Sequence, residues 1–164
     1  MQRDELQESL APGGAHDLLG RLAGEWEGTA RTWFEPGKLA DESPIAGTIR
    51  SVLGGRFVVH EYRGSLIGEP LEGIAILGYD LHRGRWQTAW IDTCHTGTQL
   101  MLAEGGGDEP SVVGGYPDPS GGSDWSWRTE VELADADTLV ITHFNVTPAG
   151  EEAKAVEIEY RRRS

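Results

Sequence analysis

Apolar and polar residues alternate along most of this chain, in short runs separated by glycine, proline and aspartate. Alternation with a period of two is typical of a β-strand that buries one face. Because the connections are short, neighbouring strands should pair antiparallel, since a parallel crossover needs a dozen or more residues. The predicted strands span 26–33, 45–52, 57–62, 71–79, 85–92, 97–104, 111–116, 125–133, 138–146 and 153–162.

A different periodicity precedes the first strand. Leu18, Leu19 and Leu22 recur at helical spacing within 15–23, and Gly24 supplies a C-terminal stop signal. A helix this short is not stable alone. We therefore expect it to lie against an apolar surface, such as one end of a barrel.

These elements predict an all-β domain at 15–164, preceded by a flexible tail at 1–14 that ends in Pro12-Gly13-Gly14. So many strands in one small domain would leave costly unpaired edges unless the sheet closed on itself. We predict an up-and-down antiparallel barrel of about ten strands, with the short N-terminal helix closing one end. A two-sheet jelly roll is the alternative, but the longer crossovers that it needs are hard to find here.

Net charge and cysteine usage restrict the classes of partner and the cellular compartment that we expect for this protein. The formal net charge of −13 would repel a phosphate backbone, so we expect no nucleic acid, and an anionic membrane surface is disfavoured for the same reason. No apolar run approaches the ~20 residues that span a bilayer, and the polar N-terminus has no apolar signal core behind it. The single cysteine, Cys94, fits a reducing compartment. We expect a soluble cytoplasmic protein of bacterial type. Its oligomeric state stays open, with a homodimer as one alternative.

The helix followed by Gly24 and Trp26 resembles the start of the calycin group of ligand-binding barrels. In lipocalins the tryptophan of this G-x-W motif packs at the barrel floor beneath an arginine from the last strand. The resemblance implies that Arg161 or Arg162 takes that part here. A guanidinium stacked over an indole would seal an open barrel end.

A closer likeness covers nearly the whole domain, from Leu18 to Arg162. The segments that carry it resemble, in order and spacing, a bacterial calycin-like family known only as domain of unknown function 1579. That family carries no established activity. The matching segments are 24–28, 53–57, 73–80, 86–92 and 150–160.

Nitrobindin-like haem barrels share the G-x-W-x-G opening and are more distantly similar. They hold ferric haem through a histidine near the C-terminus. The final strand here, 153–163, contains no histidine. Haem is therefore not favoured as a cofactor, although a histidine from another strand could take the role.

Alternation places several aromatic and polar side chains on the predicted inner faces of the strands. An aromatic wall with a few polar groups suits a small hydrophobic or aromatic ligand. The alternative is that the tryptophans simply fill the interior. The predicted ligand-binding residues are His60, Tyr62, Trp90, Asp92, Trp127 and His143.

Candidate chemistry is sparse beyond this wall. Reactive residue types adjoin only at 92–95, where Cys94 and His95 are adjacent and would point to opposite faces of a strand. His60, His95 and His143 could converge on a metal, but no metal-binding spacing marks them, so we expect no metal. Nucleophile-elbow, phosphate-loop and dinucleotide motifs are absent from the sequence.

The sequence therefore favours a binding module for a small hydrophobic or aromatic ligand over an enzyme. Two alternatives stay open. One is a small-molecule enzyme that uses His60 or His143, and its mark would be a histidine hydrogen-bonded to a carboxylate such as Asp92. The other is a structural or interaction barrel with a filled core.

Overall fold

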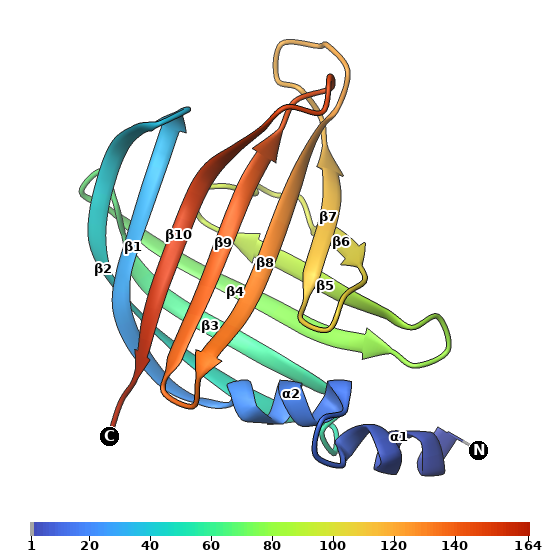
Figure 1. Cartoon of the computed structure of the whole chain (residues 1–164). Helices are drawn as coiled ribbons and strands as arrows, with labels where there is room; N and C mark the ends of the chain where they lie inside the picture. The colour runs from blue at the N-terminus through green and yellow to red at the C-terminus, as the bar shows by residue number, and fades with distance from the viewer. Residues whose placement is uncertain (1) are drawn as a thin grey trace.

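Ten strands close into one antiparallel barrel in the computed structural model, which describes residues 2–164 (Figure 1). Each strand pairs with its neighbours along the chain, and β1 pairs with β10 to close the sheet. The predicted all-β, up-and-down barrel is confirmed. The strands are β1 (Gly24–Glu35), β2 (Lys38–Val52), β3 (Phe57–Leu66), β4 (Glu69–Asp80), β5 (Arg85–Asp92), β6 (Met101–Gly105), β7 (Ser111–Tyr116), β8 (Trp125–Asp135), β9 (Thr138–Val146) and β10 (Glu152–Arg162).

The predicted strand boundaries hold best where a glycine or proline turn ends the strand. Two predicted boundaries are wrong. Strand β2 begins at Lys38 and not at 45, and the first half of the predicted strand at 97–104 belongs to a loop at 93–100, so that β6 begins only at Met101. Gly97 has a φ of +59°, which is a turn conformation and not an extended one. This loop shapes the candidate site described below.

Helix α2 (Ala15–Leu22) is the helix predicted from the leucine spacing. It buries Leu18, Leu19 and Leu22 and packs against β2, β3 and β4 at one end of the barrel (Figure 1). None of the helices in the described part of the chain is long and apolar enough to span a bilayer.

A second helix, α1 (Gln2–Leu10), lies where we predicted only a flexible tail, so that prediction missed a helix. Its apolar residues are too few to make an amphipathic pattern. What fixes it is local contact: Leu6 is buried, Leu10 packs on Gly55 in the β2–β3 turn, and Ser9 Oγ lies 2.8 Å from Nδ1 of His16 in α2. Of the predicted tail, Met1 lies outside the described residues.

Trp26 and Arg162 seal the end of the barrel beside α2. Trp26 is fully buried, and its Nε1–H donates to the carbonyl of Leu22 at 2.9 Å. The Arg162 guanidinium lies 4.3 Å from the centre of the Trp26 ring. The arginine implied by the calycin resemblance is therefore Arg162. Arg161 instead donates a hydrogen bond to Thr138 on β9.

Candidate functional site

A row of inward-facing residues crosses five adjacent strands, from the start of β1 to the end of β5. The ladder pairs Trp26 with Gly47, Gly47 with Tyr62, Tyr62 with Gly73, and Gly73 with Asp92. Large side chains thus alternate with glycines. A Cβ built on Gly73 would lie 2.1 Å from the Tyr62 ring, so only glycine lets that ring lie against the wall.

Tyr62 connects the wall to the end of β5. Its hydroxyl donates to Asp92 Oδ2 at 3.1 Å and accepts from Trp90 Nε1–H at 2.7 Å. Burial, together with the nearby Asp92 carboxylate, raises the pKa of Tyr62 far above its usual value. Tyr62 therefore stays protonated and acts as a fixed hydrogen-bonding group.

Asp92 holds the loop 93–100 against the end of β5. Its Oδ1 accepts from the backbone N–H groups of Cys94 and His95, which is an Asx turn. Its Oδ2 accepts from His95 Nδ1–H at 2.5 Å. Burial opposes ionisation of Asp92, but the hydrogen bonds and charge of His95 outweigh it and hold the pKa of Asp92 below its usual range.

An aromatic layer forms where this loop folds over the barrel interior. The His95 ring lies 5.6 Å from Trp90 and 5.9 Å from Trp127, measured between ring centroids. The two indoles are stacked at 5.6 Å, and the His143 ring is nearly parallel to Trp90 at 5.2 Å. The layer closes the interior at the end away from α2.

Between this layer and α2 lies an interior cavity of about 80 Å³. Its lining is mainly aliphatic and aromatic, with His60 and His143 as its imidazoles and no Lys or Arg. The lining residues are Leu22, Ile49, Val58, His60, Tyr62, Ala75, Leu77, Thr88, Trp90, Met101, Ala103, Trp127, Thr129, Val131, Leu139, Ile141, His143 and Ile158.

Burial keeps both imidazoles of this cavity neutral. It lowers the pKa of His60 to about 4. It also lowers the pKa of His143 to about 3, with a smaller contribution from His95. His60 Nε2 lies 2.9 Å from the Tyr160 hydroxyl, while His143 Nδ1 accepts from Trp127 Nε1–H at 3.1 Å.

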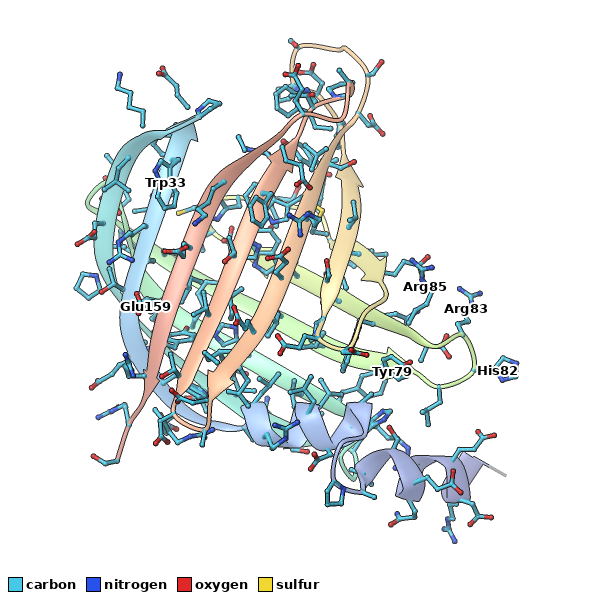
Figure 2. The ribbon with its side chains drawn as sticks, viewed as in Figure 1. Trp33, Tyr79, His82, Arg83, Arg85 and Glu159 are labelled. Atoms are coloured by element: carbon cyan, nitrogen blue, oxygen red, sulfur yellow. The ribbon has the colours of Figure 1, made fainter. Side chains whose placement is uncertain are left out.

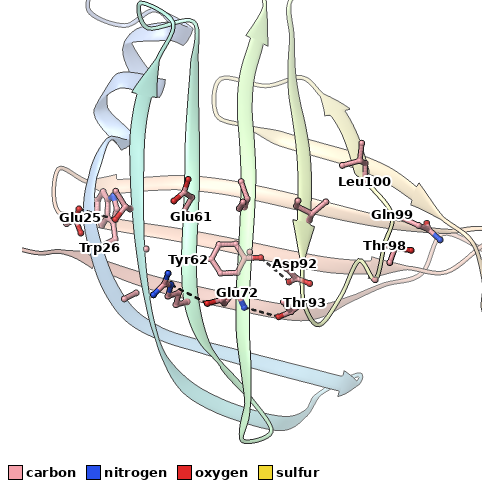
Figure 3. A pocket seen from close by; sticks show the side chains of 18 of the residues that line it. Glu25, Trp26, Glu61, Tyr62, Glu72, Asp92, Thr93, Thr98, Gln99 and Leu100 are labelled. Atoms are coloured by element: carbon pink, nitrogen blue, oxygen red, sulfur yellow. Dashed lines mark hydrogen bonds and ion pairs between the residues drawn. The ribbon is translucent and has the colours of Figure 1, made fainter.

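A larger hollow of about 860 Å³, here called the outer groove, lies across the outer side of β1–β5. It is bordered by residues 97–100 of the loop 93–100 (Figure 3). Outward-facing Glu61, Ile74 and Ile91 line it, and Tyr62 and Asp92 are reached from it beside the glycines of the row. Tyr62 borders both hollows and so stands between the outer groove and the interior cavity.

The structure brings five of the six predicted wall residues together around the interior cavity: His60, Tyr62, Trp90, Trp127 and His143. Asp92 does not line that cavity. It lies behind Tyr62 and borders the outer groove. That these residues bind a ligand stays a prediction.

Sequence reasoning missed His95 as part of the site. A strand continued through 92–95 would point this side chain away from the barrel, but the loop turns it back over the tryptophans. The available signal was the aspartate itself at the end of the strand, because an Asx turn at Asp92 reverses the chain at that point.

Haem does not fit the interior as the side chains stand. The cavity of about 80 Å³ is well below the ~300 Å³ at which pockets for sizeable ligands begin. Nδ1 of His143 already accepts a hydrogen bond, which leaves the ring proton on Nε2 and no free lone pair for iron. Residues 2–164 contain no cluster of three potential metal ligands.

A family model for a protein of unknown function, DUF1579, matches residues 11–162. The chain belongs to the DUF1579 family. The predicted likeness to this family is therefore confirmed. No curated protein matches this DUF1579 member significantly.

Solved structures with the same fold include Rv2717c from M. tuberculosis, with 13% identity and a TM-score of 0.62, covering 94% of this chain and 99% of that one. The S-type phycobiliprotein lyase CPES from Guillardia theta has 11% identity and a TM-score of 0.56, covering 90% and 91%. At these identities the likeness concerns the fold alone.

Proposed function

We propose that the DUF1579 barrel binds a small hydrophobic or aromatic molecule in its interior cavity. The observation that supports this most directly is the lining. Trp90, Trp127 and His143 form one wall, and most of the remaining lining is aliphatic. Ligand sites commonly combine apolar walls with a few polar groups.

The size of the cavity limits the ligand. About 80 Å³ is roughly half of an engineered cavity of about 150 Å³ that binds benzene. Met101 is half-buried and lines the cavity, and an unbranched thioether can change rotamer to make room. A single-ring compound is therefore the size class that we propose. A fully packed core would leave no such void, which argues against a filled structural barrel.

The fold is compatible with this role. One structural neighbour is named a phycobiliprotein lyase, so a barrel of this type occurs in a protein with a role beyond structure. At 11% identity it suggests no particular ligand for this chain. The ligand class proposed here rests on the cavity alone.

Tryptophan fluorescence tests the proposal, because Trp90 and Trp127 form the wall. Titration with toluene or acetophenone should shift or quench the emission saturably, and calorimetry should register the same binding. Ala75→Leu should abolish the response, because Ala75 lines the cavity and the added atoms would fill it.

Ala89→Leu is the matched control, since Ala89 lies on the outward-facing side of β5. It should bind as the wild type does. No change in emission and no heat with any of the compounds would refute binding in this cavity.

A second candidate is catalysis by the Asp92–His95 pair. His95 Nδ1 lies 2.5 Å from Asp92 Oδ2, and its Nε2 is buried without a partner within the described residues. A histidine oriented by a carboxylate can act as a general base. This is the mark expected of the enzyme alternative, carried by a different histidine than predicted.

Hydrolysis of p-nitrophenyl acetate tests this second candidate. A rate above that of free imidazole, lost in His95→Asn and kept in His82→Asn, would support it. His82 is an exposed residue at the β4–β5 turn (Figure 2). Equal rates for the two variants would refute it for this reaction.

A further inference from the structure

The hydrogen bonds around His143 determine which of its ring nitrogens carries the proton. Trp127 Nε1–H can only donate, and it lies 3.1 Å from His143 Nδ1, so Nδ1 accepts. Thr129 Oγ1, at 2.7 Å from the same nitrogen, can share that lone pair as a second donor. An imidazole that accepts at Nδ1 carries its proton on Nε2. His143 Nε2–H is therefore a donor.

His60 is fixed in a similar way on the neighbouring wall. The Tyr160 hydroxyl is fully buried, and its one hydrogen bond within residues 2–164 joins it to His60 Nε2 at 2.9 Å. A buried O–H almost always finds an acceptor, so the phenol donates and Nε2 accepts. The ring proton of His60 then lies on Nδ1.

These two N–H groups have no hydrogen-bond partner among the described residues, although both histidines line the cavity. The other polar atoms of the wall are mostly engaged. Trp90 Nε1–H donates to the Tyr62 hydroxyl, which in turn donates to Asp92. Thr88 adds a hydroxyl that can either donate or accept. The lining therefore offers mainly donors.

We propose that the cavity selects neutral apolar molecules that carry a hydrogen-bond acceptor, such as a ketone, received by His143 Nε2–H and His60 Nδ1–H. This inference rests on the proposed function and names the ligand class for the same site. A ligand without an acceptor would leave two buried donors unpaired, which is unfavourable. A carboxylate would be desolvated with no Lys or Arg beside it.

A pair of isosteric probes tests the ligand class. Acetophenone and α-methylstyrene have the same shape, but only the first carries a carbonyl acceptor. Their affinities, measured by tryptophan fluorescence, define a ratio for the wild type and for each variant. His143→Phe should shift that ratio about tenfold toward α-methylstyrene, because one hydrogen bond is lost. His82→Phe, at the exposed turn, should leave it unchanged.

The outcomes separate the two proposals. If both probes bind and the ratio is the same in wild type and His143→Phe, the proposed selection for ligands with a hydrogen-bond acceptor is wrong, while binding in the cavity stands. If neither probe binds, the proposed function itself fails. His60→Phe should shift the ratio in the same direction and serves if His143→Phe does not fold.

Histidine NMR tests the donor assignment without any ligand. Long-range ¹H–¹⁵N spectra of protein with labelled histidine at pH 7 should give His143 protonated on Nε2 and His60 protonated on Nδ1. Both patterns should persist at pH 5.5. A proton on Nδ1 of His143 would overturn the inference regardless of what the titrations give.

Discussion

Gly73 and Gly47 determine how two aromatic rings lie against the barrel wall. Each faces inward at a position where a side chain would collide with a ring or hydroxyl: Tyr62 beside Gly73, and Tyr160 beside Gly47. With Tyr62 flat against the wall, its hydroxyl reaches both Asp92 and Trp90. A residue without a side chain thus positions a polar group of the site.

Replacing Gly73 with alanine should therefore destabilise the barrel. The new Cβ would lie 2.1 Å from the Tyr62 ring, and overpacking of this kind costs about 1–3 kcal/mol. The free energy of unfolding in urea should fall by that amount, and the Trp90 emission should change as Tyr62 moves.

Gly20→Ala in α2 is the opposite case, since nothing lies within 4 Å of a Cβ at that position. It should stabilise the protein by about 0.5–1 kcal/mol, because a helical glycine is entropically costly. Equal unfolding free energies for the two variants would contradict this explanation.

At the scale of elements, Arg162 joins the helix, the first strand and the β8–β9 turn. Its guanidinium donates to the carbonyls of Ala23 and Arg21 at the end of α2, at 2.6 and 3.0 Å, and to Ala136 at 3.0 Å. The same group covers the Trp26 ring. A short helix that would be unstable alone is thereby capped and attached to the last strand.

Arg162→Ala should cost about 2 kcal/mol in the free energy of unfolding, through the lost cation–π contact and the unpaired helix carbonyls. Arg162→Lys should recover only part of it, because an ammonium cannot make all three contacts at once. Arg161→Ala is the control. It removes one hydrogen bond to Thr138 and should cost less than half as much. A larger loss for Arg161→Ala in urea denaturation would contradict the assignment.

At the scale of the whole molecule, His60 and His143 are neutral in the folded barrel and free to protonate when the chain unfolds. The pKa of His60 is lowered to about 4 and that of His143 to about 3, both by burial. Burial also lowers the pKa of His16 in α2. The groups that act on His143 are His95, Asp92 and His60, and burial outweighs them all.

Stability should therefore decline as the pH falls from about 6.5 toward 4. In this window the unfolded chain binds protons that the native barrel does not, so acid favours unfolding. At pH 5 the loss should reach about 2 kcal/mol for each of His60 and His143. Asp92 affects stability at a lower pH than the histidines do, because its stabilising charge is lost only as the pH falls below the usual carboxylate range.

Urea unfolding at pH 7.5, 6 and 5 measures this decline. His60→Gln should flatten the profile, and His82→Gln should leave it as in the wild type. A wild-type profile that is level between pH 7 and 5 would contradict the burial of neutral histidines.

Strand alternation predicted the barrel and placed His60, Tyr62, Trp90, Trp127 and His143 on inner faces, because the side-chain period of a strand is a local property. The leucine spacing predicted α2 for the same reason. Helix α1 escaped prediction, since its few apolar residues are fixed by contacts with α2 and the β2–β3 turn.

The tertiary structure alone decided which of these side chains meet. Arg162 and not Arg161 covers Trp26 because the register of β10 against β1 pairs position 162 with position 26. His95 lies in the site because the backbone N–H groups after Asp92 donate to its carboxylate, and this Asx turn reverses the direction of the chain. The proton positions on His60 and His143 depend on partners 100 and 16 residues away. Periodicity along the chain carries the fold, whereas hydrogen-bond partners brought together by closure of the barrel determine its chemistry.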